Sequence, residues 1–399
     1  MTPTIDERTS RRNVLLLALS QGLFMIGTST MIAEAALVGY ALAENKALAT
    51  LPTGLQQLMV MVTAIPASFL MQRVGRRWGF TVGALFGIAG AAVATIGVFQ
   101  ASFVLFCLGT VLTGIYNGFG QFYRFAAVDG STAEWRSKAI SYTLAGGVIA
   151  AVIGPELAKA TKDMLAPVAY AGSFAALIGV ACVALLVVQF IQIPAPSLAE
   201  RSGEGRKLSE IARNPVFVVA VLAAMVGYGG MAFVMTVTPL AMVVHHHPFE
   251  SAALVIQWHV LAMFAPSFYT GSLIARFGVV RIMMAGAVLF GAALAVNLSG
   301  TGVPQFWIGL VLVGIAWNFL YIGGTALLTQ TYRPAEKAKV QAANDFLVFG
   351  SVAFCALSSG ALHERYGWDT LNLVLVPFLV ATLAALLWLE FRPRRPATA

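Results

Sequence analysis

Charged residues are scarce in this sequence. Only 11% of its 399 residues are Asp, Glu, Lys or Arg, whereas 59% are hydrophobic, and an ordinary water-soluble chain carries about 25% charged residues. This deficit excludes a protein whose whole surface faces water. The charges that remain are bunched between apolar runs of about twenty residues or more, each long enough to cross a hydrocarbon core of about 30 Å. The sequence therefore predicts an integral membrane protein.

Cysteines and catalytic motifs are also few. The three cysteines, Cys107, Cys182 and Cys355, are an odd number and lie deep within apolar runs, which excludes a disulfide framework. The first apolar run, from Asn13 to about Leu42, is far longer than the core of a removable signal peptide, about 7–15 residues. No nucleotide-binding loop or nucleophile–base pair is present, so we expect neither an enzyme nor a resident cofactor.

Apolar runs predict an all-α membrane protein of twelve spans. They lie near residues 13–42, 50–71, 79–98, 102–122, 138–160, 167–192, 215–243, 251–274, 280–299, 304–328, 339–361 and 370–390. Twelve spans place both termini on one side of the membrane. All but four of the 25 lysines and arginines fall on that side, the exceptions being Lys46, Lys159, Lys162 and Arg365. Because positive residues stay in the cytoplasm, both termini are expected there, in a bacterial inner membrane. The net charge of +8 thus reflects topology, and no nucleic-acid partner is expected.

The chain repeats itself at a period of about 200 residues. Gly109, Gly114 and Phe119 recur as Gly309, Gly314 and Phe319, and Gly75 and Gly83 recur as Gly278 and Gly286. We therefore expect two six-helix halves, residues 1–193 and 215–399, joined by a polar cytoplasmic linker at 194–214.

A short basic loop follows the second predicted span. It reads Arg73-Val74-Gly75-Arg76-Arg77, and a weaker copy, Arg276-Phe277-Gly278, follows the eighth. The loop resembles the signature of the major facilitator superfamily. The resemblance implies the twelve-span fold, substrate binding near the midplane between rocking halves, and a gating role for Arg73, Gly75, Arg76 and Arg77. In this chain Gln72 stands where the superfamily usually has an acidic residue, which puts the charge relay of that loop in doubt.

Methionines and a histidine mark the seventh and eighth predicted spans. Met231 and Met235 lie four residues apart, as do His259 and Met263, so each pair shares one helix face. In an antiparallel hairpin that turns at His247, the two pairs lie at the same depth. A four-ligand site is therefore geometrically feasible in the outer half of the membrane, and thioether and imidazole ligands favour Cu(I).

A further set of residues lies at the outer end of the same hairpin. Met242, His245, His246 and His247 lie at the outer turn, where they would capture an ion and pass it inward. Methionine is also a common filler of helix interfaces, so packing is the alternative explanation. His259 favours a functional site, because an ionisable residue within a span is usually functional.

The same segments carry a closer resemblance. The two motifs, together with Gln257-Trp258-His259, Tyr332-Arg333-Pro334 and the run from Gln341 to Phe346, resemble the CcoA-type (CalT) copper importers. That resemblance implies a secondary-active importer that supplies copper, as its transported substrate, to cytochrome oxidase assembly. Met231, Met235, His259 and Met263 would be its transport residues. Riboflavin transporters of the RfnT type share much of the pattern, so riboflavin or another small organic solute is the alternative substrate.

Other polar residues within the spans have two explanations each. Glu34 and Asp345 are candidates for proton coupling, because desolvation raises the pKa of a carboxyl group. Alternatively Asp345 is a structural partner of Arg136 or Lys337. Several residues would suit an organic solute if they line a central cavity: Gln57, Tyr116, Asn117, Gln121, Trp258, Trp317, Asn318 and Tyr321. We assign Arg124 and Asp129 to gating, and expect a monomer surrounded by lipid.

Overall fold

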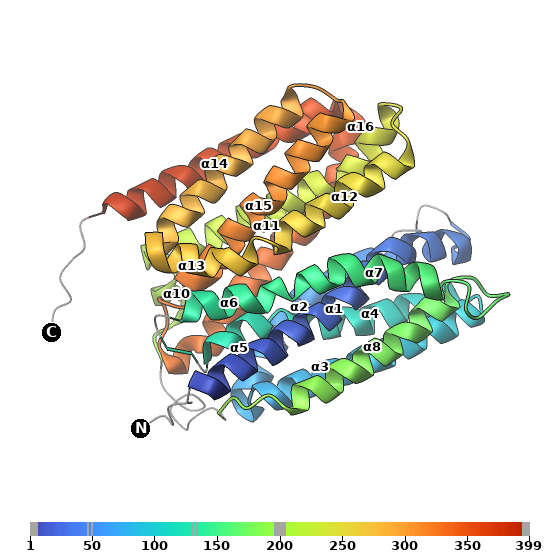
Figure 1. Cartoon of the computed structure of the whole chain (residues 1–399), viewed down its shortest axis with the longest axis horizontal. Coiled ribbons are helices and arrows are strands. Elements are labelled where there is room, and N and C mark those ends of the chain that lie inside the picture. The colour runs from blue at the N-terminus through green and yellow to red at the C-terminus, as the bar shows by residue number, and fades with distance from the viewer. Residues whose placement is uncertain are drawn as a thin grey trace. The chain divides into compact units, whose positions relative to one another are not determined.

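The chain is built from helices. The computed structural model describes residues 7–45, 48, 51–129, 131–132, 135–194 and 205–392, and this part contains helices and no strand (Figure 1). Within it, eleven helices are long and apolar enough to cross a membrane, and a bent pair, Ser251–Phe264 with Ser267–Phe277, supplies a twelfth span. The predicted all-α architecture of twelve spans is therefore confirmed.

The described residues form two compact units. Unit 1 comprises residues 1–205 and 333–353 and unit 2 comprises residues 206–332 and 354–399. The helices of unit 1 are α1 (Glu7–Leu42), α2 (Leu51–Val74), α3 (Arg76–Phe99), α4 (Phe103–Gly120), α5 (Tyr123–Asp129), α6 (Arg136–Ala145), α7 (Gly147–Thr161) and α8 (Ala171–Gln189). The short 3-10 helix η2 (Pro334–Glu336) and the first part of α16 (Lys337–Phe391) also belong to unit 1.

Unit 2 contains the remaining helices. They are α10 (Leu208–Ile211), α11 (Pro215–Val244), α12 (Phe249–Phe264), α13 (Ser267–Phe277), α14 (Val279–Leu298), α15 (Val303–Leu328) and the rest of α16. Hydrogen bonding runs through α16, yet Gly367 has a non-helical backbone, with φ 78° and ψ 179°. Two spans, Pro334–Gly360 and Arg365–Phe391, lie on either side of this region. Residues 195–204 of the predicted linker lie outside the described residues.

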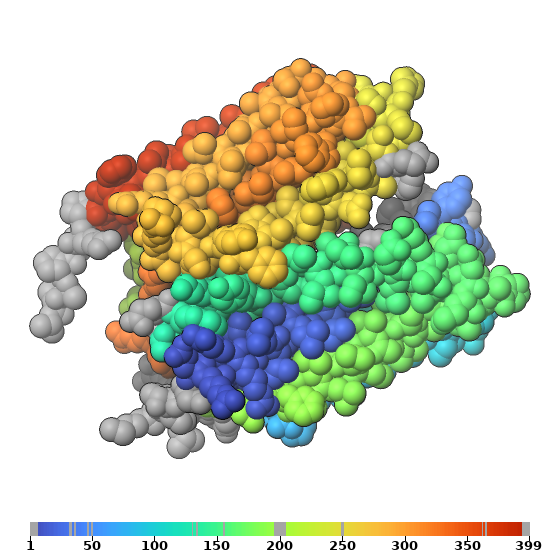
Figure 2. Space-filling view, viewed as in Figure 1, coloured from blue at the N-terminus to red at the C-terminus, as the bar shows by residue number. Residues whose placement is uncertain are grey.

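The eighth span differs from its predicted form. The sequence predicts one helix over 251–274, whereas α12 ends at Phe264 and α13 begins at Ser267 with a bend of 40°. The cause is Pro266, which has no N–H to continue the helical hydrogen bonds. The outward side chains of this broken span are large and apolar, as Trp258 and Tyr269 illustrate at 43% and 71% exposure. Figure 2 shows α12 and α13 as a yellow-to-gold band on the surface of unit 2, and such a surface suits contact with lipid.

Glycines of the internal repeat let equivalent helices pack closely in both units. A Cβ atom on Gly83 of α3 would lie 2.6 Å from Cβ of Phe119 on α4, and one on Gly286 of α14 would lie 2.9 Å from Cβ of Phe319 on α15. These contacts involve the pairs that recur in the sequence. The repeat therefore encodes the same helix contact twice, with small residues where backbones approach.

Two glycines of the repeat also share a backbone conformation. Gly75 has φ 89° and Gly278 has φ 90°, a region that side chains with a Cβ atom rarely adopt. Each begins the helix that follows the basic loop, α3 or α14. The signature glycine is thus required by the turn itself in both halves.

We expect Gly109→Ala to destabilise the protein. The added Cβ would lie 2.5 Å from the backbone nitrogen of Ala94 and 2.7 Å from its Cα, so α3 and α4 must move apart, at a typical cost of about 1–3 kcal/mol for overpacking. The matched control is Gly179→Ala, where no atom lies within 4 Å of the new Cβ. Thermal unfolding in detergent should show a lower midpoint for Gly109→Ala and none of this loss for Gly179→Ala. Equal midpoints would contradict the packing argument.

Candidate functional site

One stripe of α15 holds the broken eighth span in place. Leu310, Gly314 and Asn318 recur every four residues and so share a helix face. The carbonyl of Leu310 lies 2.7 Å from Nδ1 of His259. A Cβ on Gly314 would lie 2.8 Å from the carbonyl oxygen of His259, so only glycine permits this approach. The Asn318 amide donates to the Met263 carbonyl and to the Ser267 hydroxyl, both at 2.6 Å.

The Asn318 contacts replace hydrogen bonds that the break in the helix removes. Its amide nitrogen supplies the Met263 carbonyl, and its oxygen accepts from the Thr270 hydroxyl at 2.6 Å. Backbone groups within a membrane cannot form hydrogen bonds to water, so a broken span requires such side-chain partners. Broken spans of this kind often form the substrate sites of transporters.

His259 has one ring nitrogen without a partner. The side chain is 0% exposed, and its Nε2 makes no hydrogen bond among the described residues. Nδ1 lies against the Leu310 carbonyl, which can only accept, so Nδ1 carries the proton. No carboxylate of the described residues pairs with the ring, and a buried unpaired charge is very costly. The geometry therefore assigns a neutral imidazole whose Nε2 presents a lone pair.

Aromatic rings gather two turns along α15 from Leu310. Trp317 and Tyr321 stack with centroids 5.1 Å apart, and Tyr228 of α11 meets both edge-on at 5.3 and 5.0 Å. Phe264, at the end of α12, contacts Trp317 at 5.4 Å. The Trp317 indole is 2% exposed, and its Nε1 makes no hydrogen bond within the described part of the chain. This aromatic cluster, Tyr228, Phe264, Trp317 and Tyr321, thus contains an unused donor.

The sequence alone missed part of the aromatic cluster. Trp317 and Tyr321 were expected in a cavity, but Tyr228 and Phe264 were not singled out. A signal was present for Tyr228, since it precedes Met231 and Met235 by three and seven residues and so shares their helix face.

The structure shows where the four predicted copper ligands lie but does not show them as one site. Met231, His259 and Met263 are buried, and Met235 is half-buried. The contacts recorded for His259 and for the backbone of Met263 are to α15 rather than to α11. Among the described residues, no group of three or more His, Cys, Asp or Glu side chains could hold a metal ion, and the predicted site relies on three methionines besides His259. The four-ligand site stays a prediction.

The outer turn of unit 2 gathers more histidines than the sequence indicated. Nε2 of His247 lies 2.6 Å from the Thr301 carbonyl, and the rings of His245 and His247 lie 6.4 and 6.0 Å from Phe306. Met242 is buried, while His245 and His246 are exposed. His363, in the part of α16 between its two spans, joins this group. Its pKa is lowered by burial and by the nearby charge of His245, and its distance along the chain concealed it from sequence reasoning.

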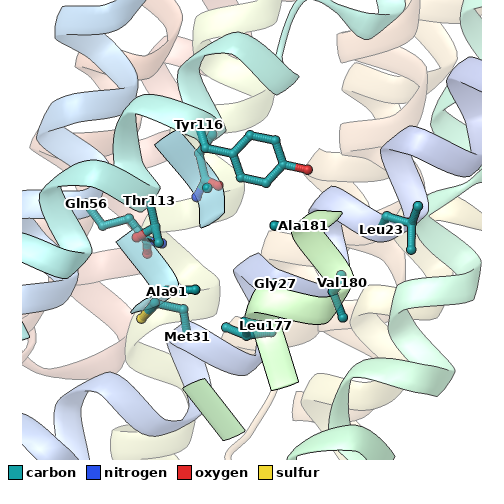
Figure 3. A pocket seen from close by; sticks show the side chains of 12 residues that line it. Leu23, Gly27, Met31, Gln56, Ala91, Thr113, Tyr116, Leu177, Val180 and Ala181 are labelled. Carbon is teal, nitrogen blue, oxygen red and sulfur yellow. Dashed lines mark hydrogen bonds between the residues drawn. The ribbon is translucent and has the colours of Figure 1, made fainter. Parts of the chain in front are cut away.

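Unit 1 contains a small cavity among α1, α2, α3, α4 and α8 (Figure 3). Its volume is about 20 Å³, enough for about one water molecule. Gln56, Thr113, Tyr116 and Asn117 give it a polar side, and the Gln56 amide donates to the Thr113 hydroxyl at 3.4 Å. Figure 3 shows the Tyr116 ring extending from α4 toward α1. Asn117 and Tyr116 were expected to line a cavity, whereas Gln56 takes the place predicted for Gln57.

Glu34 lies buried on α1. The Ser173 hydroxyl of α8 donates to its Oε1 at 3.0 Å, while Oε2 has no partner among the described residues. No basic side chain forms an ion pair with it in that part of the chain. Proton coupling at Glu34 stays a prediction.

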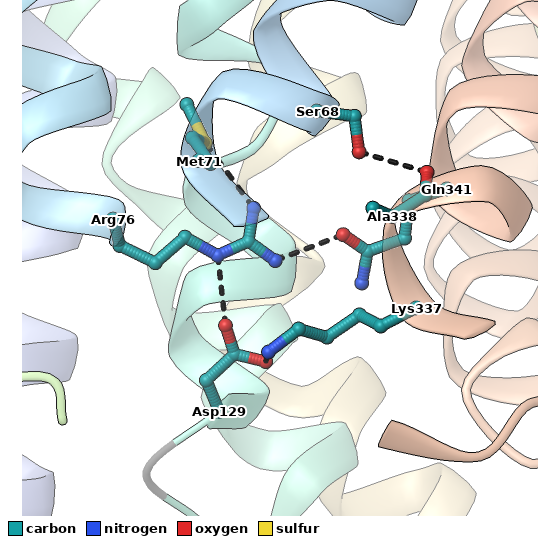
Figure 4. A network of polar contacts seen from close by, with 7 residues as sticks. All are labelled: Ser68, Met71, Arg76, Asp129, Lys337, Ala338 and Gln341. Carbon is teal, nitrogen blue, oxygen red and sulfur yellow. Dashed lines mark hydrogen bonds and ion pairs between the residues drawn. The ribbon is translucent and has the colours of Figure 1, made fainter. Parts of the chain in front are cut away.

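The basic loop forms a polar network within unit 1 (Figure 4). Arg76 is 6% exposed, and its Nε pairs with Asp129 at 2.8 Å while its Nη2 donates to Gln341 at 2.8 Å. Lys337 pairs with the other Asp129 oxygen at 3.3 Å. Arg73 and Arg77 are exposed. Asp129 therefore supplies the acidic partner that the loop lacks at Gln72.

Asp345 has a different partner from the two predicted. Its Oδ1 pairs with Arg124 of α5 and accepts from Asn344 at 2.8 Å, and both members of the pair are at most 1% exposed. The alternative of a pairing with Arg136 or Lys337 is wrong, because Arg124 takes the carboxylate and Lys337 is held by Asp129. Together these ion pairs join the first turns of α16 to α3 and α5.

Comparison with known proteins agrees with this architecture. The sequence profile of the Major Facilitator Superfamily matches residues 17–266 and 228–399. The chain belongs to the major facilitator superfamily and is a multi-pass membrane transporter.

One relative and two solved structures illustrate this membership. The riboflavin transporter RfnT of Brucella anthropi is 41% identical over 394 residues, covering 98% of this chain and 99% of the relative. The XylE double-tryptophan mutant has a TM-score of 0.81 at 13% identity, over 96% of this chain and 95% of that one. FucP in the outward conformation has a TM-score of 0.74 at 17% identity, over 97% and 100%. The two structures show the fold.

Removing Arg124 alone from its buried ion pair with Asp345 should destabilise the protein more than removing both residues. Arg124→Ala leaves the Asp345 carboxylate buried and unpaired, which typically costs about 3–5 kcal/mol. Adding Asp345→Ala removes that charge, so the double variant should unfold at a higher temperature than Arg124→Ala alone.

The exposed pair of Arg281 with Glu390 is the matched control. Its atoms lie 2.6 Å apart, but Arg281 is 66% exposed, so Arg281→Ala should cost about 0–1 kcal/mol. Thermal unfolding in detergent is measured for the unmodified protein, Arg124→Ala, Asp345→Ala, the double variant and Arg281→Ala. Strictly additive losses in the double variant would show that the pair is not coupled.

Proposed function

We propose that this protein carries riboflavin across the bacterial inner membrane by alternating access. The observation that carries the proposal is its 41% identity, over almost the full length of both chains, to a riboflavin transporter. Riboflavin, the alternative substrate indicated by the sequence, therefore becomes the first candidate substrate.

The chemistry of unit 2 supports a planar heteroaromatic solute. The aromatic cluster brings rings from α11, α12 and α15 together, and aromatic rings bind flat ligands by stacking. Sites for small organic molecules are mainly apolar, with a few polar atoms that fix orientation. The unpartnered His259 Nε2 and Trp317 Nε1 are such atoms.

Copper uptake is the second candidate, and one observation favours it. Metal-binding histidines usually donate their other ring N–H to a backbone carbonyl or carboxylate, which is how Nδ1 of His259 is held. Met263 follows one turn later, and a thioether would be a suitable Cu(I) ligand. The organic solute accounts for the aromatic rings as well, and for that reason we place it first.

Uptake by cells separates the two substrates. The chain is produced in cells that lack their own riboflavin and copper importers, and accumulation of radiolabelled riboflavin and of radioactive copper is measured at matched membrane levels. We expect riboflavin to accumulate and copper to stay at background. Tyr228→Ala should lower riboflavin uptake, because it removes a ring that contacts both Trp317 and Tyr321.

A control variant and two contrary results complete the uptake experiment. Tyr269→Ala removes an aromatic ring that is 71% exposed, and it should leave uptake unchanged. Copper accumulation without riboflavin would reverse the order of the two proposals. Failure of both substrates to enter would overturn both.

A further inference from the structure

We infer that His259 Nε2 and Trp317 Nε1 form an acceptor–donor pair that reads the polar edges of the transported heteroaromatic ring, with Nε2 accepting from an N–H group of the solute. This inference rests on the proposed function and adds to it the residues that set specificity. Both atoms are buried without a hydrogen-bond partner among the described residues.

The unused hydrogen-bonding capacity needs an explanation. A buried donor or acceptor without a partner costs about 1–3 kcal/mol, and native proteins leave few of them. In unit 2 the two ring nitrogens have opposite roles, since an indole N–H can only donate and Nε2 of the neutral imidazole can only accept. A solute that carries both an acceptor and an N–H at its edges would satisfy both.

Three residues of α15 position the acceptor and the helix that carries it. Leu310 holds the proton of His259 on Nδ1, Gly314 brings α15 against the His259 backbone, and Asn318 stabilises the break one turn further on. Packing alone would not require the lone pair of Nε2 to be kept free. These contacts serve a group whose orientation matters.

The two positions on α15 that hold His259 and carry Trp317 are spaced to suit a fused ring system. Leu310, which holds His259, and Trp317 are seven residues apart, or about 10 Å along the helix axis. That length is comparable with the long axis of three fused six-membered rings. The stacked and edge-on rings around Trp317 would cover the face of such a solute.

The internal repeat places a polar group at the equivalent position of unit 1. Gly114 approaches the carbonyl of Gln56 as Gly314 approaches that of His259, at 2.6 and 2.8 Å from a Cβ built on each glycine. Gln56 lines the cavity of unit 1. Each unit therefore has a polar residue beside a close helix crossing at the equivalent position of the repeat.

The test uses a riboflavin analogue that is methylated at the imide nitrogen and so lacks the ring N–H. Its strength as a competitor of radiolabelled riboflavin uptake is compared with that of unlabelled riboflavin. In the unmodified protein the analogue should be weaker by about tenfold, the effect of one lost hydrogen bond to a buried group. In His259→Ala the two competitors should be nearly equal.

Trp317→Phe is the matched variant. It removes the donor and keeps an aromatic ring, so riboflavin should bind more weakly while the discrimination against the methylated analogue is retained. If His259→Ala does not reach the membrane, His259→Phe provides the same comparison, because it keeps a ring and has no acceptor.

Each outcome separates the inference from the proposed function. Riboflavin uptake with equal competition by the two flavins in the unmodified protein would overturn the inference and leave the function standing. Discrimination that survives in both His259 variants would also overturn it. Absence of riboflavin uptake in the unmodified protein would instead refute the proposed function.

Discussion

Lipid cannot supply hydrogen bonds, and most of this structure follows from that constraint. A polar group within a span must find its partner inside the protein or lose several kcal/mol. The broken eighth span shows the consequence: the Met263 carbonyl near Pro266 is supplied by the Asn318 amide. The ion pair of Arg124 with Asp345 shows it for charges, since neither side chain has access to solvent. Polar residues that do have partners are therefore explained by structure alone.

The same constraint gives weight to the polar atoms that have none. In unit 2, α15 supplies partners to the broken span at Leu310 and Asn318, yet it leaves Nε2 of His259 unused beside them. A helix that supplies partners to the other polar groups of the span beside it has no structural reason to omit one ring nitrogen. The omission is consistent with a group that is satisfied only when solute is bound.

The sequence alone predicted the parts of the fold that depend on composition and repetition. Twelve spans follow from run lengths, and the repeated glycines indicated contacts that the structure places at Gly83 with Phe119 and at Gly286 with Phe319. The break after Phe264 was missed because a proline within an apolar run does not by itself tell a kink from a break. The partner of Asp345 was missed because Arg124 lies 221 residues away, and the choice among several cations depends on packing that periodicity does not encode.

The prediction of the candidate site from sequence was limited in the same way, and this limit bears on the choice between the two substrates. Spacing on α11 and α12 singled out His259 and the methionines, a prediction that stays open. It carried no information on α15, whose Leu310 holds the imidazole and whose Gly314 lies against the His259 backbone. A neutral imidazole with a free lone pair can bind a soft cation or accept from an N–H group equally well. The aromatic cluster of the same unit favours the second, because a metal ion needs further ligands whereas a planar solute needs rings to stack on. Tyr228, Phe264, Trp317 and Tyr321 provide faces, and this is the physical reason to place the flavin before the metal.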